Sequence, residues 1–199
     1  DRVSTISGRM VDRALAKGVA TERVLHFPNW VDISGITPLA QPSPYRAELG
    51  LAPDAVVALY SGNMGNKQGL EILADVARLL QDEPRIQFVL GGNGSGRADL
   101  QARCAGLNNV RFLDLQPLER LNDWLGLADV HLLPQRADAA DLVMPSKLTG
   151  MLASGRAVLA TAKPETELGR VVAQDAACGL VVPPENAAAM AEALRALAA

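Results

Sequence analysis

The sequence has 199 residues, of which 49% are hydrophobic, and this is enough for one domain with a full core and a smaller appendage. A formal net charge of −3 and a pI near 5.4 argue against a protein whose main task is to grip the backbone of nucleic acid. Two cysteines without a C-x-x-C pair or a His-rich cluster indicate neither a disulfide framework nor a zinc site. No apolar run approaches the ~20 residues that span a bilayer. We therefore expect a globular, cytoplasmic protein with no nucleic-acid partner.

The first 36 residues are predicted to be a remnant of a neighbouring domain. The chain begins without methionine and inside a predicted strand, residues 3–7, so we expect it to be part of a longer polypeptide. Residues up to about 35 follow the order strand, helix, strand. Pro38, Pro42 and Pro44 then interrupt the pattern, and we place a domain boundary between residues 36 and 37.

From residue 56 onward, apolar strands alternate with amphipathic helices. Strands are predicted at 56–60, 86–90, 110–113, 130–133, 157–160 and 179–182, and helices at 70–80, 98–104, 118–126, 146–153, 167–173 and 187–198. Strands that are apolar on both faces, separated by helices, predict a Rossmann-like, doubly wound parallel sheet over residues 37–199. Ligands of such sheets bind at the carboxyl ends of the strands, so the loops after the strands are the candidate sites.

The loop after the first of these strands, residues 61–69, carries three glycines ahead of a helix. Gly62 and Gly65 allow backbone N–H groups to approach a bound group, the helix N-terminus favours an anion, and Lys67 adds a positive charge. This combination indicates a phosphate cradle. An ordinary strand-to-helix turn with a solvated lysine is the alternative, because neither the Walker pattern nor a complete G-x-G-x-x-G is present.

A second glycine-rich loop, residues 91–96, follows the next strand. A dinucleotide site should place its glycines after the first strand and an acid at the tip of the second. Here the glycine-rich loop follows the second strand instead of the first, and Asp114 is the only candidate acid. An NAD-binding oxidoreductase domain is therefore the weaker hypothesis. Close approach of this loop to a ribose or a sugar stays open.

The start of the predicted helix 146–153 is the most informative position. Pro145 and Ser146 suit a helix start, with Ser146 as the cap, but Lys147 in the first turn is unfavourable for the helix dipole. An anion bound at that end would make the lysine favourable, and we prefer this interpretation to an exposed lysine. No D-x-D motif occurs, so no metal site is predicted. Mid-strand His131 is interpreted as a hydrogen-bonded core residue, and Trp124 as a packing residue.

Taken in chain order, these segments resemble the C-terminal, donor-binding domain of the retaining GT-B glycosyltransferases of group 1. The resemblance runs over nearly the whole chain and includes Ser-Thr-Ile-Ser at 4–7, Phe-Pro-Asn-Trp-Val-Asp at 27–32 and Tyr-Ser-Gly-Asn-Met-Gly at 60–65. A closer likeness, to the colanic-acid-type exopolysaccharide glycosyltransferases, rests on Leu-Gln-Pro-Leu-Glu-Arg-Leu at 115–121, His-Leu-Leu-Pro-Gln at 131–135 and Met-Pro-Ser-Lys-Leu-Thr-Gly-Met-Leu-Ala-Ser-Gly at 144–155.

The resemblance implies a site for a nucleoside diphosphate sugar. It places Asn63 and Gln68 near the diphosphate, Ser146 and Lys147 on its distal phosphate, and Gln116 at the start of the loop that contacts the base. Glycines of the second loop would line the nucleoside. The candidate donor-binding residues are Gly62, Asn63, Gly65, Lys67, Gln68, Gly91, Gly92, Gly94, Gln116, Met144, Pro145, Ser146, Lys147 and Leu148.

Two departures from the family pattern limit what can be transferred. Much of the family has Arg and Lys where Asn63 and Gln68 stand, and the glutamates of an E-x7-E pattern where Leu142 and Gly150 stand. The roles of those acids are therefore not assigned here, and no catalytic residue is named.

The family likeness implies transfer of a sugar to an acceptor hydroxyl with retained anomeric configuration, without cofactor or metal. The implied partners are the donor, an N-terminal acceptor-side domain of the same chain and, through that domain, a lipid-linked glycan at the inner face of the cell membrane. Residues 1–36 would be the end of that domain and the interdomain linker, so we expect no turnover from these 199 residues alone. A non-catalytic nucleotide-binding or assembly module on the same scaffold is the other alternative.

Overall fold

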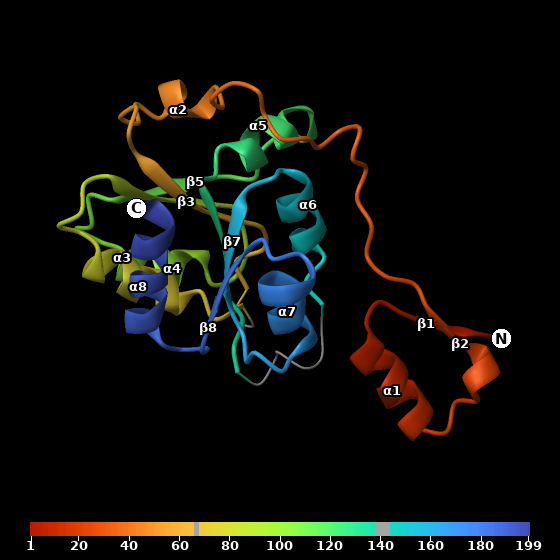
Figure 1. Cartoon of the computed structure of the whole chain (residues 1–199). Helices are drawn as coiled ribbons and strands as arrows, with labels where there is room; N and C mark the ends of the chain where they lie inside the picture. The colour runs from red at the N-terminus through yellow and green to blue at the C-terminus, as the bar shows by residue number, and fades with distance from the viewer. Residues whose placement is uncertain (66–67, 138–143) are drawn as a thin grey trace.

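The computed structural model describes residues 1–65, 68–137 and 144–199. Its N-terminal unit contains β1 (Val3–Thr5), α1 (Gly8–Ala16), a 3-10 turn (Thr21–Arg23) and β2 (Val24–His26), and the two strands pair in parallel. Figure 1 shows this unit at one side of the larger domain, to which an extended segment connects it. The strand predicted over residues 3–7 is shorter because the Ser7 hydroxyl accepts a hydrogen bond from the Met10 N–H and begins α1.

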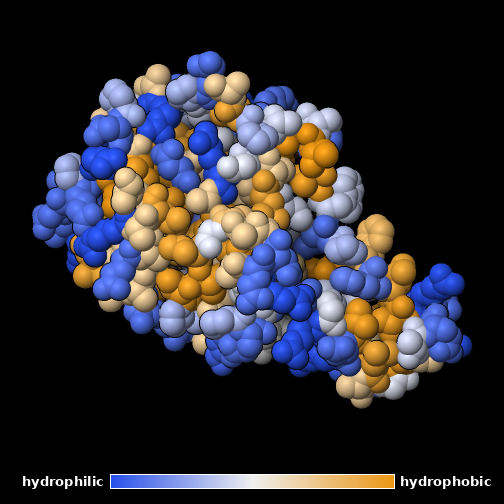
Figure 2. Space-filling view, viewed as in Figure 1, coloured by the Kyte–Doolittle hydropathy of each residue, from blue (hydrophilic) through white to orange (hydrophobic). Residues whose placement is uncertain are grey.

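The N-terminal unit buries little apolar surface of its own. None of the α1 residues is buried, and Val3, Leu25 and Phe27 are exposed. Figure 2 shows the apolar side chains gathered on this unit. Its contacts with the larger domain include the Glu167 carboxylate, which accepts the Gly8 and Arg9 N–H groups at 3.3 and 3.4 Å. The domain boundary between residues 36 and 37 stays a prediction.

The larger domain is built on a six-stranded, wholly parallel sheet, which confirms the predicted doubly wound α/β fold. Its spatial order is β5-β4-β3-β6-β7-β8. The strands are β3 (Val56–Ser61), β4 (Ile86–Gly91), β5 (Val110–Leu113), β6 (Val130–Leu133), β7 (Ala157–Thr161) and β8 (Gly179–Val182). The chain adds strands outward from β3 to β5 and then crosses to β6, so the strand order reverses between β3 and β6. A crevice at the carboxyl ends of the strands is expected there.

Helices cover both faces of the sheet (Figure 1). One layer contains α3 (Glu71–Leu79), α4 (Arg97–Arg103) and α8 (Ala187–Ala198), and the other contains α5 (Leu121–Gly126), α6 (Lys147–Ala153) and α7 (Glu167–Arg170). Alternate residues of β3 serve the two layers: Ala58 and Tyr60 pack with α3 and α8, whereas Val57 and Leu59 pack with α5.

Two predicted helices differ in form from the prediction, and one short helix was not predicted. The helix predicted over residues 118–126 begins as a 3-10 turn (Leu118–Arg120), and the helix over 167–173 continues from α7 into a π-helical segment (Val171–Asp175). The unpredicted helix, α2 (Tyr45–Glu48), follows Pro44. Tyr45 is 2% exposed and packs with α5, so this segment belongs to the core of the larger domain.

Candidate functional site

The loops after β3 and β4 form one interlocked backbone structure at the carboxyl edge of the sheet. The first loop, defined here as residues 62–65, donates from the Gly62 N–H to the Gly91 carbonyl at 3.0 Å and from the Met64 N–H to the Asn93 carbonyl at 2.8 Å. The second loop, residues 91–96, donates back from the Gly96 N–H to the Met64 carbonyl at 2.7 Å. The structure thus brings the predicted glycines of both loops together at the point where the strand order reverses.

The glycines of the second loop are required by packing inside the protein. Gly92 has φ 134°, and a Cβ there would lie 1.9 Å from the carbonyl oxygen of Gly62. A Cβ on Gly91 would lie 2.2 Å from the Trp124 ring, whose indole N–H donates to the Ser61 hydroxyl at 2.8 Å. Close contact between the loops therefore explains these glycines without a ligand, and their contact with a nucleoside stays a prediction.

Lys147 occupies the centre of this edge. It is the first residue of α6, and its Nζ donates to the Tyr60 hydroxyl at 3.1 Å and lies 4.5 Å from the centroid of the same ring. A Cβ on Gly62 would be 3.0 Å from that nitrogen, so the ammonium lies against the first loop. Burial lowers the pKa of Lys147 to about 8. Among the described residues, no carboxylate lies within ion-pair distance of it.

The helix dipole, which the sequence suggested as the reason why Lys147 needs an anion, does not explain this position in the structure. Ser146 has helical dihedrals, φ −60° and ψ −27°, and its side chain makes no capping hydrogen bond, so the predicted cap is wrong. The helix has seven residues, and the lysine side chain runs to the first loop. Partial burial of a cation that has no counter-ion among the described residues, rather than the helix dipole, makes the position unfavourable without a ligand.

The first loop offers further donors beside Lys147. The backbone N–H groups of Asn63 and Gly65 have no hydrogen-bond acceptor within the parts of the chain that the structure describes. Gln68 follows this loop, and its Oε1 is buried without a hydrogen-bond partner among the described residues, 3.0 Å from where a Cβ on Gly65 would stand. Lys67, which the sequence placed in the same cradle, and Leu142 lie outside the described residues. The loop that carries these two N–H groups therefore also lies against the Lys147 ammonium, and such donors together suit an anion.

Gln116 is held by the protein on both ends of its carboxamide. Its Oε1 accepts from the Tyr45 hydroxyl at 2.7 Å, and its Nε2 donates to the Asp114 carbonyl at 2.8 Å. Gln116 thus fixes the loop after β5, and its amide is turned toward the protein. Asp114, the acid that a dinucleotide site would need, accepts a hydrogen bond from Arg97, which weakens that alternative further.

The remaining candidate residues around α6 make packing contacts or hydrogen bonds within the protein. Leu148 is 3% exposed and packs in the core with Leu133 and Met151, so its side chain is not free for a ligand. The Met144 carbonyl accepts from the Asn29 amide of the connecting segment at 3.3 Å, and the Pro145 carbonyl accepts from the Leu148 N–H. His131 is fully buried 3.0 Å from the Ser154 hydroxyl, as a core histidine should be, and burial lowers its pKa to about 3.

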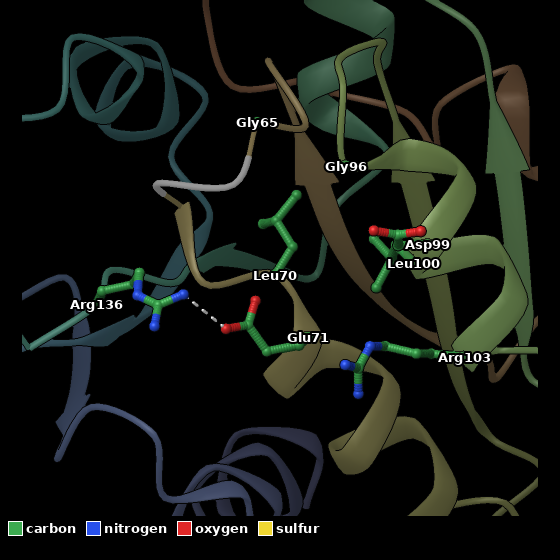
Figure 3. Close-up of a pocket in the computed structure, with 8 residues that line it drawn as sticks. All are labelled: Gly65, Leu70, Glu71, Gly96, Asp99, Leu100, Arg103 and Arg136. Carbon is green, nitrogen blue, oxygen red and sulfur yellow. Dashed lines mark hydrogen bonds and ion pairs between the residues drawn. The ribbon is translucent and has the colours of Figure 1, made fainter.

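A separate cavity of about 230 Å³ lies beside the first loop, between α3 and α4. Its charged lining combines two acids, Glu71 and Asp99, with two arginines, Arg103 and Arg136. Arg136 pairs with Glu71 at 3.1 Å, as the dashed line in Figure 3 marks. Equal numbers of acidic and basic groups give no preference for an anion. Lys147 differs from this cavity, because no carboxylate among the described residues lies within ion-pair distance of it.

Within the described part of the chain, no group of three or more His, Cys, Asp or Glu residues is arranged to hold a metal ion. No helix in it has the length and apolar character needed to cross a membrane.

The chain matches the family model described as "Glycosyl transferases group 1" over residues 55–199. It is 40% identical over 198 residues to the putative colanic acid biosynthesis glycosyl transferase WcaI of Escherichia coli K12, an alignment that covers 98% of this chain and 49% of that protein. Two solved structures share the fold at 19% identity. WaaG, a glycosyltransferase involved in lipopolysaccharide biosynthesis, has a TM-score of 0.79, and the match covers 99% of this chain and 53% of WaaG. Anabaena HepE, solved in complex with UDP and glucose, has a TM-score of 0.78, and the match covers 98% of this chain and 52% of HepE. The chain spans about half the length of these relatives.

Proposed function

Since the chain belongs to the group 1 glycosyltransferases, we propose that residues 37–199 are the donor-binding domain of one, and that they bind a nucleoside diphosphate sugar at the edge where β3, β4 and β6 end. The observation that carries the proposal is Lys147, a half-buried ammonium that has no carboxylate within ion-pair distance among the described residues. It lies against a loop in which the N–H groups of Asn63 and Gly65 have no acceptor in the described chain. A diphosphate supplies the missing negative charge, and its oxygens accept from the same N–H groups. HepE, solved with UDP, supports this class of ligand.

The reaction places a clear demand on this site. The bond between the anomeric carbon and the diphosphate oxygen breaks, a bond to the acceptor oxygen forms, the hydroxyl proton passes to a base, and the anomeric configuration is retained. Negative charge grows on the departing diphosphate as its bond breaks. Donors fixed in advance by the fold, Lys147 and the N–H groups of Asn63 and Gly65, stabilise that charge without reorganising.

The acceptor side belongs to the part of the relatives that this chain does not span. Residues 1–36 are proposed as the end of that first domain and the linker, which agrees with the exposed apolar side chains of β1 and β2. The likeness to WcaI, a putative colanic acid biosynthesis glycosyl transferase, supports a role in polysaccharide biosynthesis. The proposed acceptor is a lipid-linked glycan at the cytoplasmic face of the membrane. We expect no turnover from the 199 residues alone.

Calorimetric titration of the chain with UDP, GDP, dTDP and ADP, with their nucleosides and with NAD, tests this function. We expect one nucleoside diphosphate to bind at least about tenfold more tightly than its nucleoside, because the charged contacts are to phosphate. NAD should bind more weakly, since Asp114 is engaged by Arg97. Tighter binding of NAD would favour the oxidoreductase alternative, and binding by a longer chain that transfers no sugar would favour the non-catalytic module.

A further inference from the structure

Tyr60 connects Lys147 to the first loop through a single oxygen atom. It is the second-last residue of β3 and is fully buried. Its hydroxyl donates to the Asn63 carbonyl at 2.6 Å and accepts from Lys147 Nζ at 3.1 Å. Burial raises the pKa of the Tyr60 phenol, so the O–H stays protonated at physiological pH and the two hydrogen bonds keep these directions.

The peptide between Asn63 and Met64 is fixed from both sides. Its carbonyl accepts from Tyr60, and its N–H donates to the Asn93 carbonyl at 2.8 Å in the second loop. This fixed peptide sets the direction of the neighbouring N–H groups of Asn63 and Gly65, which have no acceptor in the described chain. The ammonium is fixed in the same way, because the Tyr60 ring lies on one side of it and the backbone of Gly62 on another.

We propose that Tyr60 is a positioning residue of the donor site: its hydroxyl holds the Lys147 ammonium and the first-loop peptide in the arrangement in which both face the diphosphate. This inference rests on the proposed function for its ligand and goes beyond it in assigning a residue that does not touch the donor. Without the hydroxyl, the ammonium loses its only side-chain acceptor in the described chain, and the Asn63 carbonyl loses its donor. Loss of positioning weakens every contact to the diphosphate without removing any of them.

The variant Tyr60→Phe removes the oxygen and keeps the ring. Ser43→Ala is the matched control, because Ser43 is also buried and its hydroxyl also donates to a carbonyl, that of Asp123 at 2.7 Å, at the opposite edge of the sheet. We expect Tyr60→Phe to weaken binding of the nucleoside diphosphate about tenfold. Its binding of the nucleoside, and the binding of both ligands by Ser43→Ala, should stay within about twofold of wild type.

A second readout separates positioning from a merely structural role and needs no ligand. The chain has four lysines, so reductive methylation with 13C-formaldehyde gives few signals, and Lys147 can be assigned with Lys147→Arg. Because the hydroxyl accepts from the charged amine, its removal should lower the pKa of Lys147 below that of wild type, whereas Ser43→Ala should leave it unchanged. If Tyr60→Phe folds poorly, the wild-type chain is labelled with 3-fluorotyrosine instead, which gives two 19F signals because the chain has only two tyrosines. The 19F signal of Tyr60 should then respond to titration of Lys147, while that of Tyr45 should not.

The outcomes distinguish the two proposals. If wild type binds no nucleoside diphosphate more tightly than its nucleoside, the proposed function fails. The ligand-free titration still decides whether Tyr60 holds the ammonium. If the diphosphate binds but Tyr60→Phe changes neither its affinity nor the titration of Lys147, the function stands and the positioning role of Tyr60 is overturned.

Discussion

Replacing Lys147 by methionine asks whether this buried cation exists to meet an anion. Methionine keeps the length and apolar stem of the side chain and removes the charge. Burial lowers the pKa of the amine from 10.5 to about 8. That difference corresponds to about 3 kcal/mol by which burial disfavours the charged form at neutral pH. The lost hydrogen bond to Tyr60 offsets about 1 kcal/mol of this or more. We therefore expect the ligand-free variant to be as stable as wild type, or more stable by up to about 2 kcal/mol.

Binding should change in the opposite direction. A hydrogen bond to a charged group contributes about 1.5 to 3 kcal/mol, so Lys147→Met should weaken binding of the nucleoside diphosphate by about 10- to 150-fold. Binding of the nucleoside, which carries no phosphate, should hardly change. Lys163→Met is the matched control, because Lys163 is exposed and the variant makes the same change in net charge.

Titration calorimetry of both ligands, with urea denaturation of each ligand-free protein, gives the two free energies. If Lys147→Met binds the diphosphate as tightly as wild type, the ammonium does not contact the phosphate. If the variant unfolds at clearly lower urea than wild type, Lys147 is a structural residue and not a binding one.

Three further predictions follow from the same geometry. Affinity for the nucleoside diphosphate should fall as pH rises through about 8, where Lys147 of the ligand-free protein loses its charge, while affinity for the nucleoside stays constant. Because the unfolded chain keeps the same proton up to pH 10.5, the contribution of Lys147 to the free energy of unfolding should rise between those two pH values. Gly92→Ala should cost more than about 2 kcal/mol of unfolding free energy, since its Cβ would lie 1.9 Å from a first-loop carbonyl oxygen. Its control, Gly106→Ala, also has a positive φ, 81°, but meets no atom within 4 Å and should cost about 1 kcal/mol. Equal losses in urea denaturation would contradict the role of packing at Gly92. Trp124→Ala should cost about 3 to 5 kcal/mol, because the ring is 2% exposed and fills the space against the second loop, and a loss below about 1 kcal/mol would contradict that role.

The sequence was sufficient for the fold because the strand signals are local and strong. Four-residue apolar runs such as Gly179–Val182 appear in the structure with the predicted bounds. Helix ends were less predictable where geometry changes inside a helix, as at the 3-10 turn Leu118–Arg120 after Pro117. The helix α2 was not predicted because it is short and follows prolines that interrupt the strand and helix pattern. Its burial depends on contact with α5, far along the chain.

The candidate site was located by topology, but its contacts could not be predicted. Parallel strands bring their following loops to one edge, so the two glycine loops were expected to meet. Tyr60 and Lys147 are 87 residues apart, and nothing in either local sequence indicates that the phenol accepts from the amine. Tyr45 and Gln116 are 71 residues apart and present the same difficulty. The cap assigned to Ser146 failed because residue type alone does not fix the backbone dihedrals on which capping depends.

A map of amide shifts during titration of the 15N-labelled chain with the tightest-binding nucleoside diphosphate tests directly where the donor binds. We expect the largest shifts at the N–H groups of Asn63, Gly65 and Lys147, with smaller ones in the second loop, since the Lys147 ammonium lies against the first loop. The cavity at the opposite edge of the sheet, lined by residues that include Leu39 and Arg46, should show none. Shifts concentrated at that opposite edge, or at the charge-balanced cavity between α3 and α4, with Asn63, Gly65 and Lys147 unmoved, would contradict a donor site at the ends of β3, β4 and β6.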